Sequence, residues 1–98
     1  MTYGLTVKAE AVLDIIEAFD WYEGKRTGLG TEFLDELEKY YDKITHTPGH
    51  YPLYLAEQRI AVMHRFPYKI VFEVELDTIV VYAVYHYKRD PEKLTDRK

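Results

Sequence analysis

The second half of the chain shows the apolar and polar alternation that is typical of β-strands. Residues 68–75 alternate with a period of two, and residues 79–84 are apolar at every position, as in a strand covered on both faces. Phe66-Pro67 and Leu76-Asp77 have the turn chemistry that ends one strand and begins the next. The pattern therefore predicts three consecutive antiparallel strands within residues 59–91.

The first half predicts one short strand and two helices. Residues 3–7 alternate, and apolar residues then recur every three or four positions in residues 8–23 and again in residues 31–45. Residues 24–30 contain three glycines and form the connection, and Thr31 is suited to cap the second helix. The expected buried stripes are Val12, Ile15, Ile16, Phe19 and Tyr22 in the first helix and Phe33, Leu34, Leu37, Tyr40, Tyr41 and Ile44 in the second.

The order β-α-α-β-β-β predicts an α+β domain in which a helical hairpin covers one face of a sheet. A two-residue turn at Leu76-Asp77 sets the register of the last two strands. If the loop at Phe66-Pro67 has an odd number of residues, Arg59 lies opposite Glu73. The helix-free face is then either a docking surface or an ordinary half-hydrated face. Its expected residues are Arg59, Ala61, Met63, Lys69, Val71, Glu73, Val80, Tyr82, Val84 and His86.

A length of 98 residues allows one domain, which we place at residues 1–91, followed by a polar tail at residues 92–98. The chain has no cysteine, a formal net charge of −4 and no apolar run near the roughly 20 residues that cross a bilayer. These features predict a cytoplasmic protein without membrane contact, metal or cofactor, and argue against phosphate binding as its main activity. We expect Asp14, Glu17 and Asp20 on a solvated helix surface. We expect His46 and His50 in a loop and His64 in a strand, none of them as a metal ligand.

Several short motifs resemble, in order and spacing, the RelE/ParE superfamily of bacterial toxins from type II toxin–antitoxin modules. The likeness is greatest to its ParE-like, or plasmid stabilisation, branch and runs over nearly the whole chain. Its most specific part is RFPY, from Arg65, combined with H-x-x-RDP, from His86, after a helical hairpin. The other motifs are Trp21-Tyr22-Glu23, Gly28-Leu29-Gly30 with Phe33-Leu34, Tyr51-Pro52 and Ile79-Val80-Val81.

This resemblance implies a four-stranded sheet with the first strand beside the last. It implies a cognate antitoxin that is small, acidic and partly disordered, and that folds as it wraps across the toxin. Only the antitoxin of the pair would contact DNA. A ParE-like toxin arrests growth by inhibiting DNA gyrase through protein–protein contact. Two alternatives stay open: a RelE-like endonuclease that cleaves mRNA on the ribosome, and a non-toxic remnant that only binds antitoxin.

The residues expected to bind antitoxin or target lie on the helix-free face and in the basic stretch after it. No catalytic residue is expected of a gyrase inhibitor. In the nuclease alternative the catalytic set would be His86, Lys69, Arg65 and Arg89, because the predicted register puts Lys69 and His86 within reach of one phosphate. The acidic net charge favours the gyrase inhibitor. The expected binding residues are Arg59, Met63, Arg65, Val71, Tyr82, Val84, His86, Tyr87, Lys88 and Arg89.

Overall fold

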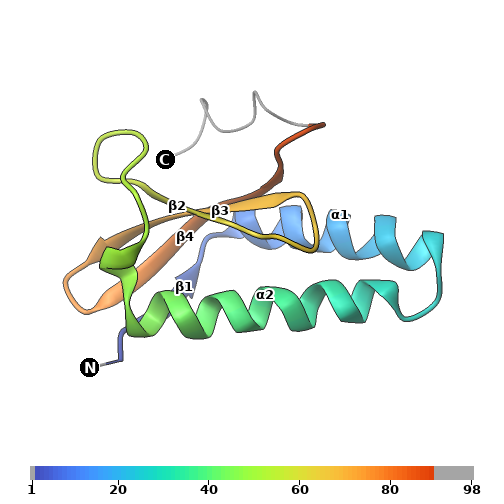
Figure 1. The fold of residues 1–98 in the computed structure, drawn as a ribbon, viewed down its shortest axis with the longest axis horizontal. Helices are drawn as coiled ribbons and strands as arrows, with labels where there is room; N and C mark the ends of the chain where they lie inside the picture. The colour runs from blue at the N-terminus through green and yellow to red at the C-terminus, as the bar shows by residue number, and fades with distance from the viewer. Residues whose placement is uncertain (1, 90–98) are drawn as a thin grey trace.

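The computed structural model describes residues 2–89, and the predicted tail at residues 92–98 lies outside them. The elements follow the predicted order (Figure 1). Within the described part of the chain, neither helix has the length and apolar character that a membrane span requires. The elements are β1 (Gly4–Val7), α1 (Ala9–Lys25), α2 (Leu29–His46), the short 3-10 helix η1 (Pro48–His50), β2 (Arg59–Val62), β3 (Tyr68–Glu75) and β4 (Thr78–His86).

The four strands form one sheet in the order β1-β4-β3-β2. β1 runs parallel to β4, whereas β4 pairs with β3, and β3 with β2, in antiparallel fashion. The two helices form an antiparallel hairpin that packs against the sheet (Figure 1). The predicted α+β fold, with a helical hairpin on a mainly antiparallel four-stranded sheet and the first strand beside the last, is therefore confirmed.

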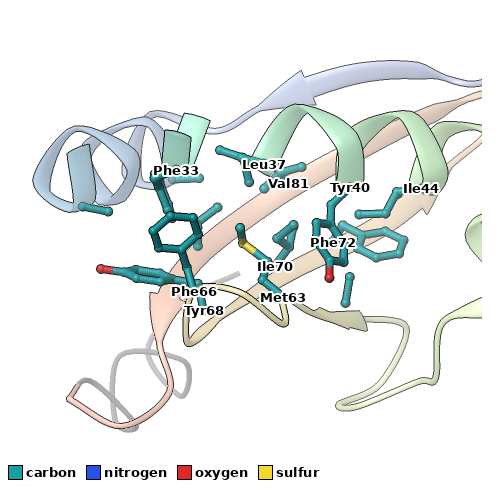
Figure 2. Close-up of a cluster of buried hydrophobic side chains, with 14 of the residues drawn as sticks. Phe33, Leu37, Tyr40, Ile44, Met63, Phe66, Tyr68, Ile70, Phe72 and Val81 are labelled. Atoms are coloured by element: carbon teal, nitrogen blue, oxygen red, sulfur yellow. The ribbon is translucent and has the colours of Figure 1, made fainter. Parts of the chain in front are cut away.

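The main core lies between the helices and the sheet (Figure 2). The predicted stripe of α2 points into it, from Phe33 near the start of the helix to Ile44 near its end. Phe33 packs edge-on against Phe66 and Tyr68, with ring centroids 5.4 and 5.0 Å away. Such aromatic pairs contribute about 0.5–1.5 kcal/mol each beyond the area that they bury. They tie the beginning of β3 to the first turns of α2.

α1 packs through smaller side chains than its apolar pattern predicts. Its buried residues are Ala11, Asp14 and Ala18, spaced three and four positions apart on one face. The predicted stripe is wrong for Val12 and Ile16, which are about half exposed. Small residues on the inner face let the helix lie close to β4, and the larger aliphatic residues beside them are then left outside.

A carboxylate from α1 caps the start of α2. The second helix begins at Leu29, two residues before the predicted N-cap Thr31, and its N-cap is Gly28 with a left-handed φ of 90°. Glu23 accepts hydrogen bonds from the backbone N–H groups of Gly28 and Gly30, at 2.9 and 3.0 Å. Glu23 thereby satisfies amide groups that have no acceptor within the helix, which is the role predicted for Thr31.

β4 contains one residue more than β3 at the centre of their pairing. Phe72 pairs with Val81, but the preceding residue of β3, Val71, pairs with Ala83. Tyr82 is therefore the extra residue of a β-bulge. Between the hairpin turn and the bulge the predicted register holds. Beyond the bulge each residue of β4 faces the side opposite to the predicted one, because side chains alternate with a period of two.

The bulge overturns part of the predicted division between the two faces. Val84 and His86 were expected on the helix-free face, and this prediction is wrong. Val84 belongs to the main core, and His86 stands edge-on to Tyr68 at a centroid distance of 5.2 Å. Ala83 and Tyr85 take the vacated positions and pack on the helix-free face.

β2 is also shifted by one residue from its predicted register. Arg59 pairs with Phe72, so the predicted cross-strand pair of Arg59 with Glu73 does not form. Arg59 instead donates a hydrogen bond from Nη1 to the carbonyl oxygen of Tyr51 at 2.6 Å. Met63 is buried in the main core, so its predicted place on the helix-free face is wrong. The loop between β2 and β3 sets this offset, and its sequence does not specify it.

A matched pair of glycine variants tests the helix junction. A Cβ atom at Gly30 would lie 2.7 Å from the ring of Phe19 and 2.9 Å from its carbonyl oxygen, whereas one at Gly24 would have nothing within 4 Å. We expect Gly30→Ala to lower the free energy of unfolding by about 1–3 kcal/mol, because the two helices must move apart. Gly24→Ala should raise it by up to about 1 kcal/mol. Denaturant unfolding measures both, and equal stabilities would contradict this packing.

Candidate functional site

The outer edge of β4 is covered first by β1 and then by α1. β1 ends at Val7, which pairs with Val81, and α1 lies alongside the rest of β4. Asp14 of α1, which is only 5% exposed, accepts a hydrogen bond from the backbone N–H of Val84 at 3.1 Å. The carboxylate satisfies an amide on an edge where β1 has ended. The expectation that Asp14 lies in solvent is therefore wrong.

His86 holds the turn that follows β4. Its Nδ1 accepts hydrogen bonds from the backbone N–H groups of Lys88 and Arg89, at 3.2 and 2.9 Å. A ring nitrogen that accepts hydrogen bonds carries no proton, so the neutral imidazole has its hydrogen on Nε2 in this arrangement. His86 is buried, and it fixes the path of the chain from the end of the strand to Arg89.

The turn places Arg89 against two aromatic side chains. Its guanidinium donates a hydrogen bond to the hydroxyl of Tyr68 at 2.9 Å and lies 4.4 Å from the centroid of the Trp21 ring. The ammonium group of Lys25 lies 4.2 Å from the same centroid. Cation–π contacts contribute about 0.5–1 kcal/mol each at exposed sites. Trp21 therefore joins α1 to the basic stretch after β4 while it stays 46% exposed.

A pocket of about 260 Å³ opens between α1 and the end of β4. Asp14 and Glu17 contribute carboxylates, Arg89 contributes a cation and Trp21 an aromatic surface. This mixture of charges and aromatic surface is more typical of a protein-binding surface than of an apolar small-molecule site. We call the pocket the α1–β4 groove. Its remaining lining residues are Ala18, Tyr68 and Val84.

Basic side chains gather beside the groove, at the end of the molecule where α1 meets α2. Glu32 forms ion pairs with Arg26, at 3.1 Å, and with Arg65. Hydrogen bonds from Arg26 and then from Arg65 hold the pKa of Glu32 below its usual value. The guanidinium of Arg65 also lies 5.0 Å from the centroid of the Phe66 ring. We call this region the basic end, and it comprises Lys25, Arg26, Arg65, Lys88 and Arg89.

The centre of the helix-free face is closed. Val71 is fully buried and Tyr85 only 5% exposed, and with Ile60 they belong to a second hydrophobic cluster. Tyr87 packs against this cluster, and the ammonium group of Lys69 lies 5.5 Å from the centroid of the Tyr87 ring. The prediction of a docking surface with an exposed apolar centre is therefore wrong for this face.

Tyr82 lies on the helix-free face, as predicted, but its polar tip is engaged. Its hydroxyl donates a hydrogen bond to Glu75 at 2.9 Å. Burial, followed by that hydrogen bond, raises the pKa of Tyr82 to about 12. The ammonium group of Lys8 lies 5.9 Å from the centroid of its ring. These contacts hold the bulge residue in place along the surface of the sheet.

The four residues of the nuclease alternative do not form one cluster. His86 contacts Tyr68 on the helix side, whereas Lys69 contacts Tyr87 on the helix-free side. The prediction that Lys69 and His86 share a face is wrong. The bulge lies between the hairpin turn and these two residues, and it turns His86 to the opposite face of the sheet. Across residues 2–89, no group of three or more His, Asp or Glu side chains is placed to hold a metal ion.

Comparison with known proteins supports the fold at low sequence similarity. One solved structure, described as the chromosomal ParDE TA system from P. aeruginosa, matches with a TM-score of 0.77 at 13% sequence identity. The match covers 87% of this chain and 96% of that chain. No family model and no curated protein matches the sequence. The chain therefore has the RelE/ParE-like fold that its motifs predict.

The groove includes residues that the sequence pattern did not assign to a site. The pattern predicts Asp14 and Glu17 in solvent, and it favours a place in the core for Trp21. One signal was present: Asp14 lies between Ala11 and Ala18 at the spacing of a buried helix face. A carboxylate there requires a donor on the neighbouring element, and that donor is a backbone amide that sequence cannot locate.

Variants of Asp14 test whether the carboxylate supports the edge of β4. Asp14→Ala should lower the free energy of unfolding by about 1–3 kcal/mol, because it leaves the buried N–H of Val84 without an acceptor. Asp14→Asn keeps an oxygen acceptor and should cost less. The control Asp20→Ala, on the exposed side of α1, should stay within about 0.5 kcal/mol of the original protein. The measurement is denaturant unfolding followed by Trp21 fluorescence; if Asp14→Ala and Asp20→Ala are equally stable, the bond contributes nothing.

Proposed function

We propose that this protein is the toxin of a type II toxin–antitoxin module and that a small cognate antitoxin keeps it inactive in the cytoplasm. The observation that carries the proposal is the fold, which matches a chain of a ParDE TA system over 96% of that chain's length. The motifs from Arg65 and from His86 support the same conclusion independently of the fold. From these motifs, Arg65 and Arg89 belong to the basic end, and His86 holds the turn beside the α1–β4 groove.

We place the antitoxin on the α1–β4 groove and the basic end. An acidic segment of the antitoxin would meet Lys25, Lys88 and Arg89 there, and opposite charges speed association and orient the partner. α1, which carries Lys25, also has an exposed aliphatic ridge formed by Val12, Leu13 and Ile16. A segment with both acidic and apolar residues would cover the ridge and the cations together as it folds.

For the target we propose DNA gyrase, inhibited through protein–protein contact without a catalytic step. Two observations support this choice over the ribosome. The net charge of −4 opposes docking on ribosomal RNA. His86 uses Nδ1 to hold the backbone turn that follows it, and it lies on the opposite face of the sheet from Lys69. A nuclease would need these two side chains together, one to move protons and the other to hold a phosphate.

Expression of the protein alone should arrest bacterial growth, and co-expression of the small antitoxin encoded beside it should restore growth. The arrested cells should show a DNA-damage response, because a poisoned gyrase leaves broken DNA. With purified components, the protein should block gyrase supercoiling and leave ribosome-bound mRNA intact. Unimpaired growth would contradict a toxin, and ribosome-dependent mRNA cleavage with normal supercoiling would contradict the gyrase proposal.

A charge-reversal variant tests the antitoxin surface. Lys88→Glu combined with Arg89→Glu should weaken antitoxin binding at least about tenfold at low salt, since the exposed cations at the groove are reversed. Lys39→Glu reverses an exposed cation on α2 that is paired with Glu36, and it should leave binding unchanged. Equal binding by the two variants would place the antitoxin elsewhere.

A further inference from the structure

The turn between β3 and β4 exposes a leucine in an unfavourable backbone conformation. Leu76 is 97% exposed and has a left-handed φ of 57°. A bulky side chain is uncommon in this conformation, and glycine or asparagine is the usual residue at such a turn position. Neither packing nor turn geometry within the protein accounts for a leucine here. A leucine kept in water at the cost of backbone strain points to a contact outside the chain.

A second exposed apolar segment lies at the same end of the molecule, in the loop between η1 and β2 (Figure 1). Leu53, Tyr54 and Leu55 are each about half exposed or more, and Ala56 after them has a left-handed φ of 49°. The loop is held in shape by backbone hydrogen bonds from Tyr54 to Gln58, at 2.7 Å, and from Gln58 to Leu55, at 2.8 Å. These apolar side chains are therefore presented by an ordered loop, which lowers the entropic cost of binding a partner.

A pocket of about 400 Å³ lies beneath this loop, between it and the edge of the sheet. Its wall mixes apolar and polar surface, with Leu53 and Ala56 from the loop and Val74 from β3 on the apolar side. We call the loop, the turn and this pocket the hairpin-end surface. The remaining lining residues are Tyr3, Pro48, Gly49, Glu57 and Arg59.

The charges around the hairpin-end surface are mainly negative. Glu57 lines the pocket and Asp77 is exposed in the turn, whereas the one cation that lines the pocket, Arg59, is engaged with the carbonyl of Tyr51. Exposed aliphatic side chains with carboxylates beside them suit an occupant that is apolar at its centre and basic at its margins. The antitoxin proposed for the basic end is acidic, so its chemistry does not match this surface.

We propose that the hairpin-end surface binds a lysine- or arginine-flanked segment of the toxin's target, which inserts a leucine or aromatic side chain into the pocket. The assignment to the target rests on the proposed function, whereas the affinity for such a segment does not. The surface lies at the opposite end of the molecule from the α1–α2 turn (Figure 1). In this proposal the antitoxin and the target bind at opposite ends of the folded molecule.

A labelled amphipathic peptide of leucine and lysine is the probe for this chemistry, and the same peptide with glutamate in place of lysine is its control. The full chain should bind the lysine peptide and not the glutamate peptide, as measured by fluorescence anisotropy. Amide shifts in ¹⁵N spectra should cluster at residues 53–58 and 74–77. Equal binding of both peptides, or shifts confined to α1, would overturn the proposal.

The combined variant Leu76→Gly with Leu55→Ser separates binding from folding. Glycine removes the strain at position 76, so the melting temperature should stay the same or rise relative to Leu55→Ser alone. Affinity for the lysine peptide should nevertheless fall at least about tenfold, as for the loss of central contact residues. Val62→Ser, at an exposed position of β2 outside both proposed surfaces, is the matched control and should bind normally. Unchanged affinity of the combined variant would overturn the proposal.

Growth arrest distinguishes failure of this inference from failure of the proposed function. If the original protein arrests growth and the combined variant does not, the surface contacts the target. If both arrest growth equally, the assignment to the target is overturned. If neither does, the toxin proposal fails, and the peptide measurement alone decides whether the surface binds basic segments. A dimer in sedimentation that the variant abolishes would instead identify a second copy as the occupant and overturn the proposal.

Discussion

The β-bulge at Tyr82 is the constraint on which the candidate site depends. One extra residue in β4 directs Val84 and His86 towards the helices, and the contacts of His86 and Arg89 depend on this change of direction. His86 reaches the position from which Nδ1 holds the following backbone, and Arg89 then contacts both Tyr68 and Trp21. In a regular strand His86 would point to the helix-free face, and the basic stretch would leave the sheet without reaching α1.

The close approach of α1 to β4 is the second requirement. Alanines on the inner face of α1 bring the helix to the strand, and Asp14 supplies the acceptor that Val84 needs at the edge. A larger side chain in place of either alanine would push the helix outwards, because a packed interior has little room to absorb extra volume. The α1–β4 groove thus results from a strand irregularity and a narrow helix face acting together.

The two proposed binding regions differ in charge and lie at opposite ends of the molecule. The basic end combines cations with the exposed Trp21, and two of its arginines, Arg26 and Arg65, are partly neutralised by the protein's own Glu32. The hairpin-end surface combines aliphatic side chains with carboxylates. Under the proposed function, the antitoxin and the target would each meet a surface of complementary chemistry.

Much of the fold could be predicted from the sequence, whereas the site could be predicted only in part. Hydrophobic patterning located both helices and the three C-terminal strands, because most of these elements bury one face and the last strand is apolar along most of its length. The irregular features gave no such signal: the bulge at Tyr82 has no glycine to mark it, and the offset of β2 depends on a loop. A shift of one residue reversed the predicted positions of Val84, His86 and Met63. Asp14 was missed because its partner is a backbone amide.

The central claim is the bulge, and interstrand backbone NOEs measure it most directly. Because NOEs connect residues that lie opposite each other in neighbouring strands, they report the register on both sides of Tyr82. The structure predicts NOEs that connect Ile70 with Val84 and Tyr68 with His86. NOEs that connect Ile70 with Ala83 and Tyr68 with Tyr85 would show an uninterrupted strand. His86 would then lie on the helix-free face, and the account of the groove would be contradicted.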